Sequence, residues 1–308
     1  MSPLRQALAN YLAVRRALGY KLARDGKLLA QLLTYLEVLG EEHLSTETVL
    51  AWATLPTAAH RSWWSYRLSI VRGFAAHLHA LDPATEVPPA DLLPWRACRA
   101  TPYLYSEQDV AGLIAAAARL RTPHRAATYR TLIGLLAVTG MRVGEAIALD
   151  RSDFDSINGL LSVRKGKFGK SRELPLHPSA SNALCNYLHR RDRPRSAAGT
   201  PALLVSTAGT RLLYCTVQRT FRQLTRRAGL RPRSACCRPR LHDLRHSFAV
   251  HTVLDSYREG GDPGARLSLL STYLGHVDPG KTYWYLSAAP ELLALAGERL
   301  ERHLGGGS

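Results

Sequence analysis

The residues able to do chemistry gather between Leu241 and Tyr285. His242 and Arg245 are three residues apart, so on a helix their imidazole and guanidinium share a face and both can grip one phosphate. His276 follows a Leu-Gly pair, and Tyr285 comes nine residues after it. A nucleophile, a cation that holds a non-bridging oxygen and imidazoles that move protons are what phosphodiester cleavage requires. We therefore expect a phosphodiester-cleaving site in this segment.

Tyr285 needs activation before it can act as the nucleophile. A free tyrosine has a pKa of ~10, so about one in a thousand is ionised at neutral pH. Neighbouring cations must stabilise the negative charge as it develops. Phosphoryl transfer depends mainly on positioning and charge neutralisation, which arginines, a lysine and histidines can supply without Mg²⁺. No metal or other cofactor is therefore expected.

Cations elsewhere in the chain can complete this set. Arg142 follows a Thr-Gly pair at an expected helix start, where it can clamp a phosphate or simply pair with Glu145. The glycine-bearing stretch 164–172 predicts a charged β-hairpin between short strands at 160–163 and 173–176. One lysine on such a turn can reach a leaving oxygen as a general acid, although a solvated charged turn has the same composition. The hairpin cations are Lys165, Lys167, Lys170 and Arg172.

The pair His242 and His246 also raises the question of a metal site, since a spacing of four places both on one helix face. However, His-Asp-Leu-Arg-His differs from the His-Glu-x-x-His zinc motif, and Arg245 would put a cation beside the metal. The five cysteines form no CxxC pair, so neither a zinc ribbon nor a disulfide framework is predicted. We expect a structural role for His246 and no bound metal.

An excess of basic residues points to a polyanionic partner. Lys and Arg number 41 against 24 acidic residues, a formal net charge of +17, which favours nucleic acid or an anionic membrane as partner. No apolar run approaches the ~18–20 residues of a membrane span, and arginines interrupt the N-terminal apolar stretches. Neither a membrane segment nor a signal peptide is expected. The cysteine pattern fits a reduced, cytoplasmic compartment.

The N-terminal third predicts a small four-helix domain. Apolar residues recur at helical spacing over about 3–19, 24–39, 45–52 and 58–81, and the Pro- and Ala-rich stretch 82–94 predicts a linker. Basic side chains remain outside the apolar stripes, and as a set they favour a DNA-facing surface over an ordinary solvated one. They include Arg15, Arg16, Lys21, Arg61, Arg67 and Arg72.

The rest of the chain predicts helices around the small antiparallel sheet. Ser106 and Asp109 form a capping-box pattern that opens a helix to about residue 120. Further helices are expected at about 123–138, 144–149, 179–190, 216–228, 242–256, 265–274 and 290–303. The predicted fold class is therefore mainly α with a small antiparallel β-sheet.

Five motifs occur in an order that points to one family. They are Thr-Gly-Met-Arg-Val-Gly-Glu-Ala at 139–146, Lys-Phe-Gly-Lys-Ser-Arg-Glu-Leu-Pro-Leu at 167–176, Leu-His-Asp-Leu-Arg-His-Ser-Phe-Ala at 241–249, Leu-Gly-His at 274–276, and the tyrosine nine residues after that histidine. Each motif is weak alone, whereas the ordered set is highly specific. The chain resembles, over its whole length, a tyrosine recombinase of the phage integrase family.

The resemblance implies a catalytic role for each motif residue. Arg142 and Arg245 would hold the scissile phosphate, and His276 would hydrogen-bond it. His242 would take part in general acid/base catalysis. Tyr285 would form a 3′-phosphotyrosyl link to the cut strand, so that neither ATP nor a metal is needed.

The same resemblance leaves some assignments open. Lys167 would protonate the leaving 5′ hydroxyl, with Lys165 as a competitor because hairpin lengths vary. Tyr283 is a second tyrosine near the expected nucleophile, and we favour Tyr285 on spacing. The Lys-Thr-Tyr-Trp segment at 281–284 departs from the common Thr-Thr pair. Glu145 would orient the Arg142 region.

The family architecture implies two domains. Residues 1–95 would form a helical, SAM-like core-binding domain on DNA, 96–105 a linker, 106–304 an α+β catalytic domain with a C-terminal helix, and 305–308 a flexible tail. The stripe of the last helix can pack on its own domain or on a neighbouring protomer. That stripe consists of Leu293, Ala296, Leu300 and Leu304.

The implied partner is double-stranded DNA, clamped by a homo-oligomer that is expected to be a tetramer, in the bacterial cytoplasm and on the nucleoid when bound. Sister recombinases of the same mobile element are possible partners, and integration, excision, transposition and resolution share this chemistry. A type IB topoisomerase-like or resolvase-like strand rejoining enzyme is one alternative. A catalytically silent DNA-binding partner in a recombination complex is another.

Overall fold

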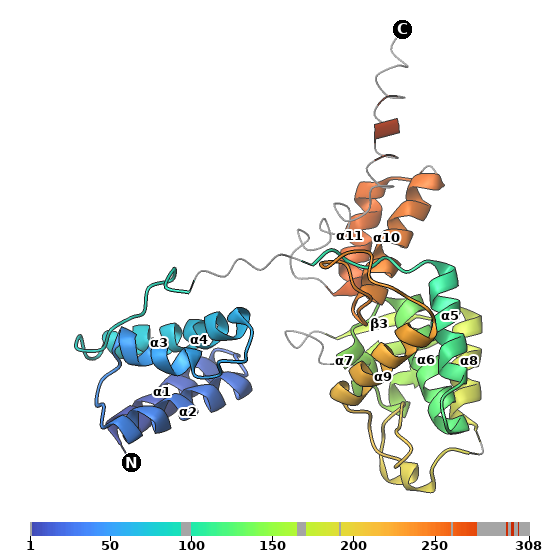
Figure 1. Cartoon of the computed structure of the whole chain (residues 1–308). Helices are drawn as coiled ribbons and strands as arrows, with labels where there is room; N and C mark the ends of the chain where they lie inside the picture. Colours follow the sequence, from blue (N-terminus) through green and yellow to red (C-terminus); the bar gives the residue numbers. More distant parts are fainter. Residues whose placement is uncertain are drawn as a thin grey trace. The chain divides into compact units, whose positions relative to one another are not determined.

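The computed structural model describes residues 2–93, 100–164, 171–190, 192–259 and 261–275, together with 294, 297, 298 and 301. Within these residues the fold is mainly helical with one three-stranded antiparallel sheet, as the sequence predicts. The chain divides into two compact units, residues 1–98 and 99–308 (Figure 1). None of the described helices is long and apolar enough to cross a membrane.

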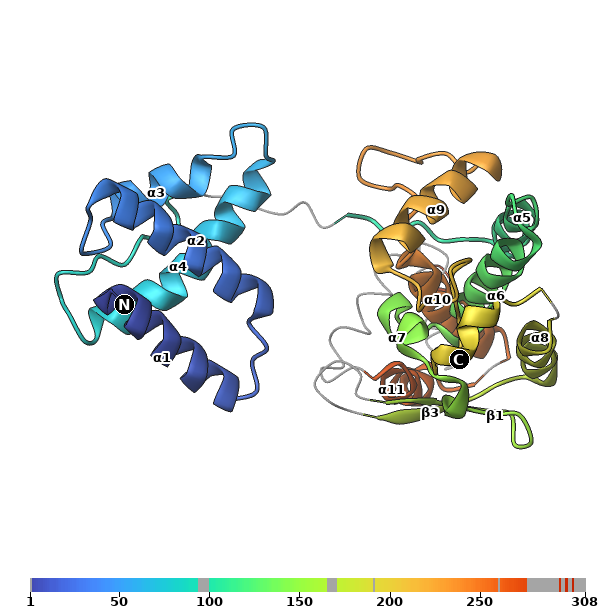
Figure 2. The same ribbon diagram turned by 90° about the horizontal axis from the view of Figure 1, so that it is seen from below.

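Four helices build the described part of the first unit (Figure 2). They are α1 (Pro3–Ala17), α2 (Ala23–Leu39), α3 (Thr46–Thr54) and α4 (Arg61–His79). Ser45, the predicted N-cap of α3, accepts a hydrogen bond from the backbone N–H of Thr48. The leucines of α2 form the common core with Trp52 of α3 and Phe74 of α4. The helical periodicity of the sequence therefore produces this unit directly.

Arg67 lies inside the first unit and not on its surface. The residue is only 7% exposed, its Nη2 donates to the backbone oxygen of Trp52 at 2.8 Å, and its guanidinium lies 3.7 Å from the centre of the Trp52 ring. Burial lowers the pKa of Arg67. The predicted DNA contact by Arg67 is therefore wrong: hydrogen bonding and a cation–π contact hold this guanidinium in the core.

The segment 82–93, predicted to be a linker, is attached to the helices of the first unit. Glu86 accepts from the backbone N–H of Thr46 at 2.7 Å, and Thr85 is 2% exposed. Arg72 donates to the carbonyl oxygens of Pro88 and Pro89 at 2.9 and 3.0 Å. These bonds attach the segment, which its composition alone predicted to be a linker, to the helices, within the 1–95 domain that the family architecture implies. The DNA contact assigned to Arg72 stays a prediction.

In the described part of the second unit, the small sheet lies along one edge of the group of helices (Figure 2). The helices are α5 (Glu107–Ala118), α6 (Pro123–Thr139), α7 (Val143–Ala148), α8 (Pro178–Leu188), α9 (Tyr214–Arg227), α10 (Asp243–Arg258) and α11 (Pro263–Leu274), with 3-10 turns at Arg151–Asp153 and Arg195–Gly199. The strands, in sheet order, are β1 (Phe154–Asp155), β2 (Leu160–Val163) and β3 (Arg172–Pro175). Both pairings are antiparallel, and Val163 lies opposite Arg172. The predicted capping box of Ser106 and Asp109 is present.

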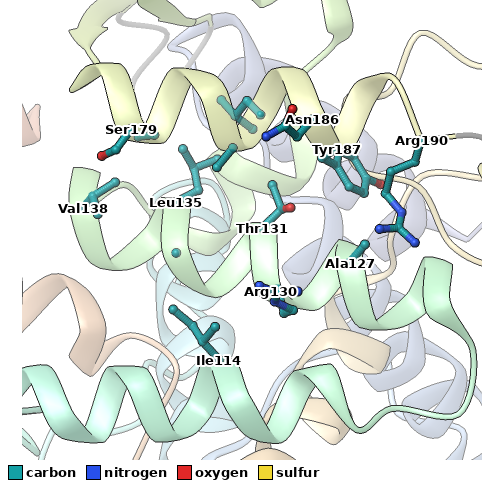
Figure 3. Close-up of a pocket in the computed structure, with 14 residues that line it drawn as sticks. Ile114, Ala127, Arg130, Thr131, Leu135, Val138, Ser179, Asn186, Tyr187 and Arg190 are labelled. Atoms are coloured by element: carbon teal, nitrogen blue, oxygen red, sulfur yellow. The ribbon is translucent and has the colours of Figure 1, made fainter.

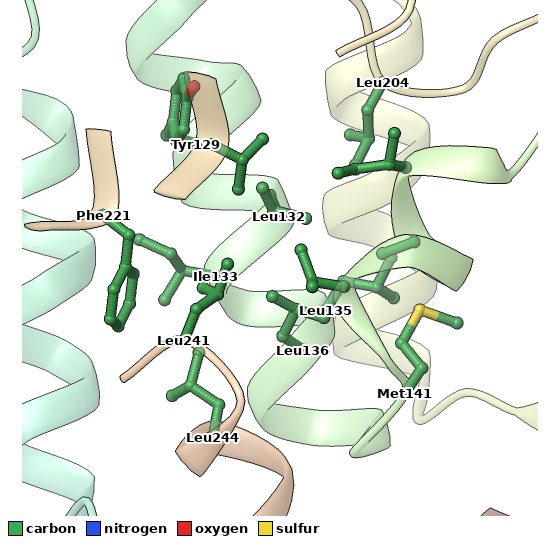
Figure 4. Packing of buried hydrophobic residues seen from close by; sticks show 14 of the residues in the cluster. Tyr129, Leu132, Ile133, Leu135, Leu136, Met141, Leu204, Phe221, Leu241 and Leu244 are labelled. Carbon is green, nitrogen blue, oxygen red and sulfur yellow. The ribbon is translucent and has the colours of Figure 1, made fainter. Parts of the chain in front are cut away.

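Helix α6 is buried on most sides at the centre of the second unit. Its residues Leu132, Ile133, Leu135 and Leu136 are at most 4% exposed. Figure 4 shows them packed among side chains of α9, α10 and the segment that follows α6. A helix that is apolar on most faces belongs in a core. Arg142, three residues after the end of α6, is therefore held by a well-packed helix.

Residues 100–105 belong to the second unit, although the sequence analysis placed them in a linker. Tyr103 is 5% exposed and Tyr105 is fully buried, with ring centres 4.9 Å apart in the core. The hydroxyl of Tyr105 donates to the carbonyl oxygen of Arg240 at 3.0 Å. The described part of the predicted linker therefore packs against the segment that precedes α10, while 96–99 lie outside the described residues.

A groove of about 430 Å³ runs between α5, α6 and α8 (Figure 3). Ala127, Thr131 and Val138 of α6 line it together with Arg130 and Arg190. None of the predicted catalytic residues that the structure describes contributes to this lining. The groove is thus distinct from the described part of the candidate site.

Replacing Arg67 by alanine should lower the free energy of unfolding by about 2 kcal/mol, because the change removes a buried hydrogen bond and the contact with Trp52. Urea denaturation of the full-length protein, followed by circular dichroism, measures the difference. Arg61→Ala is the matched control, since this arginine is exposed at the start of α4 and its loss should change stability by no more than about 0.5 kcal/mol. Equal effects of the two substitutions would contradict the buried role.

Candidate active site

Arg245 forms the buried centre of the site. It lies in the first turn of α10, is 2% exposed, and donates from Nη1 to the carbonyl oxygen of Gly140 at 2.9 Å and from Nη2 to that of Leu274 at 2.7 Å. These carbonyls lie at the C-terminal ends of α6 and α11, where helices carry partial negative charge. One guanidinium thus joins the segments that lead in the sequence to Arg142 and His276.

Gly140 is required for this arrangement by its conformation and by the space around it. Its φ of +58° lies in the left-handed region, where side chains are strained. A Cβ at this position would lie 2.4 Å from Cδ1 of Phe248, whose ring stacks on that of Tyr273 with centres 5.7 Å apart. The glycine therefore lets α6 end directly against α10.

Arg142 begins α7 and pairs with Glu145. Its backbone N–H donates to Glu145 Oε2 at 2.9 Å, and its Nη1 donates to Oε1 at 2.8 Å. The Arg142 side chain is 24% exposed. The ion pair considered from the sequence is therefore formed, and it holds the guanidinium at the N-terminal end of a helix, where anions bind favourably.

Glu145 is shared between Arg142 and Arg172. Arg172 on β3 donates to Oε2 at 2.7 Å and to Oε1 at 3.3 Å, and the Glu145 side chain is 7% exposed. Burial acts to raise the pKa of Glu145, but the hydrogen bonds from Arg172 and Arg142 outweigh it and lower the pKa to about 2. Glu145 is therefore an anion at neutral pH. Because the Arg172 side chain is only 14% exposed and engaged here, its predicted DNA contact is corrected to an internal ion pair.

His242 is held in its neutral form beside the arginines. Burial lowers the pKa of His242 to about 4, and the positive charges of Arg245, Arg142 and Arg240 add to this effect. Its ring lies edge-on to that of His246, with centres 5.0 Å apart. The imidazole is therefore neutral at pH 7 and keeps a free lone pair that can accept a hydrogen bond, and a bound phosphate anion would favour its protonation. These electrostatic effects place the charges of Arg142 and Arg245 near His242.

Asp243 fixes the helix start that carries His242, and the sequence analysis gave it no role. It is fully buried and accepts hydrogen bonds from the backbone N–H, Nε and Nη2 of Arg240 at 3.2, 3.0 and 2.9 Å. One turn later, Ser247 donates to the carbonyl oxygen of Asp243 and accepts from the backbone N–H of Tyr105. The position of Asp243 between His242 and Arg245 in the sequence could have suggested a role for it. Its burial could not be predicted from the residue type, because aspartate is usually exposed.

Helix α9 carries a basic face that the sequence analysis also missed. Val217, Phe221 and Leu224 are buried on one side of the helix. The arginines on the other side are exposed: Arg219, Arg222 and Arg226. The signal was present, because intervals of three and four residues place these arginines on one helix face, opposite the apolar positions.

The cations of the first unit differ in their exposure. Arg16, Lys21 and Arg61 are exposed, whereas Arg15 is half-buried with its guanidinium 4.0 Å from the centre of the Tyr20 ring.

Several further predicted site residues lie outside the described part of the chain. These are Lys165, Lys167, Lys170, His276 and Tyr285. The alternative nucleophile Tyr283, the final-helix stripe and the 305–308 tail also lie outside it. Among the described residues no group of three or more His, Cys, Asp or Glu side chains is arranged to hold a metal ion.

Comparisons with known proteins identify the family of the chain. Residues 104–291 match the model of the phage integrase family. The chain belongs to the phage integrase family. It is 44% identical to the "Putative integrase/recombinase y4rB" of Sinorhizobium fredii over 98% of each chain. It is 32% identical to the tyrosine recombinase XerC of Azotobacter vinelandii, over 71% of this chain and 67% of that relative.

The fold agrees with the family assignment. A lambda integrase tetramer bound to a Holliday junction superposes with a TM-score of 0.59 and 19% identity, covering 92% of this chain and 76% of that chain. Members of this family are DNA strand transferases, and this integrase is an enzyme of that class, acting in site-specific DNA recombination.

In this integrase the imidazole of His242 should titrate near pH 4, well below the ordinary value of about 6.5. Because the folded pKa lies below the unfolded one, the contribution of His242 to stability is fully present above about pH 6.5 and is lost as the pH falls towards 4. Nuclear magnetic resonance of ¹⁵N-histidine-labelled protein follows the titration, and the signal is assigned by its loss in His242→Gln. A midpoint at the ordinary value would contradict the buried, cation-surrounded site.

Proposed function

We propose that this integrase cuts one DNA strand through Tyr285 and rejoins it to a partner strand through a 3′-phosphotyrosyl intermediate. The observation that supports the proposal is that buried Arg245 bonds the carbonyl oxygens of Gly140 and Leu274 and so joins the segments that lead to Arg142 and His276, while Arg142 and Arg245 both lower the pKa of the neighbouring His242. A phosphate placed there meets two guanidiniums and a proton acceptor. Such a set can stabilise the charge of a phosphoryl transition state.

Cleavage exchanges one phosphodiester bond for another. The phenolic oxygen of Tyr285 forms a bond to phosphorus, while the bond between phosphorus and the 5′ oxygen breaks. The phenol proton passes to the imidazole of His242, and the ammonium of Lys167 gives a proton to the 5′ oxygen. The products are a 3′-phosphotyrosyl end and a free 5′ hydroxyl. Attack by the 5′ hydroxyl of a partner strand reverses these steps and needs no nucleotide energy, because the bond energy is kept in the phosphotyrosine.

The remaining groups hold the phosphate for this exchange. Arg142 and Arg245 contact its non-bridging oxygens, and His276 adds a hydrogen bond. Arg245 has a second task, because it also bonds the carbonyl of Leu274, two positions before His276 in the sequence. Arginines, a lysine and histidines supply the charge neutralisation that a metal ion supplies in other phosphoryl transferases.

DNA would lie against basic surfaces of both units. The net charge of +17 provides the sequence-independent attraction, and the exposed cations provide its local contacts. Those contacts are Arg16, Lys21 and Arg61 on the first unit and Arg219, Arg222 and Arg226 on α9. We further propose that residues 1–93 bind the core of the DNA site while the second unit carries the chemistry. Binding should therefore weaken steeply as salt concentration rises.

The proposed exchange needs two cut duplexes and therefore several protomers. The lambda integrase structure with a similar fold is a tetramer on a Holliday junction. We propose the same assembly for this integrase, either alone or with sister recombinases of the same mobile element. Each protomer would supply one tyrosine, and strands would be exchanged in pairs.

The wild-type protein should form a covalent complex with a nicked suicide DNA substrate in the presence of EDTA, and Tyr285→Phe should abolish that complex. The physical reason is that phenylalanine keeps the ring and removes only the attacking oxygen. Denaturing gel electrophoresis of labelled DNA detects the link. Tyr283→Phe is the matched control, because it removes a hydroxyl two residues away and should leave trapping intact.

The outcomes of this experiment separate the two assignments. Trapping that persists in Tyr285→Phe and vanishes in Tyr283→Phe would transfer the nucleophile to Tyr283. Tight, salt-sensitive DNA binding with no covalent product from the wild-type protein would contradict the strand-cutting function. It would favour a DNA-binding partner without activity.

A further inference from the structure

The base of the β2–β3 hairpin is anchored on both sides by an arginine and a shielded carboxylate. Arg164, just after β2, pairs through Nε with Asp153 at 2.6 Å, and Arg172, at the start of β3, pairs with Glu145 at 2.7 Å. Both carboxylate side chains are 7% exposed. In the sequence, the two anchored arginines flank the segment 165–170, which contains the candidate proton donors and lies outside the described residues.

The anchor at Arg172 is the more rigid of the two. Its side chain is 14% exposed, compared with 63% for Arg164, so water and salt screen it less. Two nitrogens of Arg172 also bond two oxygens of Glu145, which fixes orientation as well as distance. Lysine cannot reproduce this planar fork.

Glu145 connects the same anchor to Arg142. Its Oε1 accepts from Nη1 of both arginines, and its Oε2 accepts from the backbone N–H of Arg142 and from Nη2 of Arg172. The start of β3 and the start of α7 are therefore held by one carboxylate. A shift of either arginine changes the hydrogen bonds of the other.

Arg172 also lies beside the turn that ends α11. A Cβ on Gly275 would lie 3.3 Å from Nη1 and 3.6 Å from Cζ of Arg172, so the absence of a side chain permits this close approach. Gly275 has a φ of +67° and directly precedes His276 in the sequence. One guanidinium thus contacts the carboxylate that holds Arg142 and lies beside the turn before the candidate histidine.

We propose that Arg172 is a positioning residue that sets the lysine hairpin against Arg142 and the turn at Gly275, without contacting DNA itself. The inference rests on the proposed function, because it takes a hairpin lysine as the donor to the 5′ oxygen. Proton transfer requires heavy atoms about 2.6–3.2 Å apart, and catalytic groups must be held to within about 0.5 Å. A loosened hairpin base therefore impairs leaving-group protonation before it impairs phosphate binding.

A substrate with sulfur in place of the bridging 5′ oxygen isolates this effect. The bond between phosphorus and sulfur breaks to release a thiolate, whose conjugate acid has a pKa of about 8.5, so departure needs no proton donor. Single-turnover rates of covalent complex formation are compared for the oxygen and sulfur substrates. Arg172→Gln should be slowed by about 10²-fold on oxygen, the contribution typical of a general acid, and should recover to within about tenfold of wild type on sulfur.

Four variants calibrate this result. Lys167→Ala should show the same rescue by sulfur, with Lys165→Ala read in parallel because the two lysines compete for the role. Arg142→Gln should stay slow on both substrates, because the phosphate contact is still needed. Arg190→Gln is the matched control: it removes a surface arginine–aspartate pair, with Asp192, and should behave like wild type.

Each remaining outcome overturns the inference in a recognisable way. Arg172→Gln that is equally slow on both substrates would place Arg172 on the phosphate, and wild-type rates on oxygen would deny it any role. If circular dichroism shows that Arg172→Gln is unfolded, Arg172→Lys replaces it, because lysine keeps a positive charge opposite Glu145. The rates of Arg172→Lys on the oxygen and sulfur substrates are then compared in the same way. Failure of the wild-type protein to form a covalent complex on either substrate would instead contradict the proposed function itself.

Discussion

The buried guanidinium of Arg245 is the interaction on which the catalytic unit depends. A charge in the interior is unfavourable unless it is compensated, and here the carbonyl oxygens of Gly140 and Leu274 accept its protons. These partners lie 105 and 29 residues away in the sequence. Three helices are therefore placed around one cation, and Arg142 and His276, which we propose to contact the phosphate, follow closely in the sequence after two of them. Folding of this unit and assembly of its site are in this sense one event.

Local patterns in the sequence predicted much of the fold, because they have local causes. The helices of the first unit follow from leucine spacing, and the capping box at Ser106 and Asp109 follows from residue type at fixed offsets. The hairpin strands followed from a change of period around a basic turn. Arg142, His242 and Arg245 were selected by chemistry and spacing. In the structure, the charges of both arginines lower the pKa of His242. Their roles in catalysis remain proposals.

The errors concern burial, which depends on distant parts of the chain. Arg67 and Arg172 look like surface cations in the sequence, yet one lies against Trp52 and the other against Glu145. Tyr103 was assigned to a linker because the preceding proline-rich stretch hides the start of the core. The buried role of Asp243 likewise depends on Arg240 and on packing that no local pattern reveals. Long-range contacts decide whether a charged side chain meets solvent or protein.

Dissolved ions act very differently on the surface and on the interior of this enzyme. The exposed arginines are screened over about 8 Å at physiological ionic strength, so electrolyte weakens their hold on a polyanion. Glu145 is 7% exposed, and its pairs with Arg142 and Arg172 are largely hidden from mobile ions. Concentrated electrolyte would therefore release DNA held by the proposed surface contacts, while the ion pairs of Glu145 with Arg142 and Arg172 stay formed. Inhibition of this kind is reversed by dilution and requires no refolding.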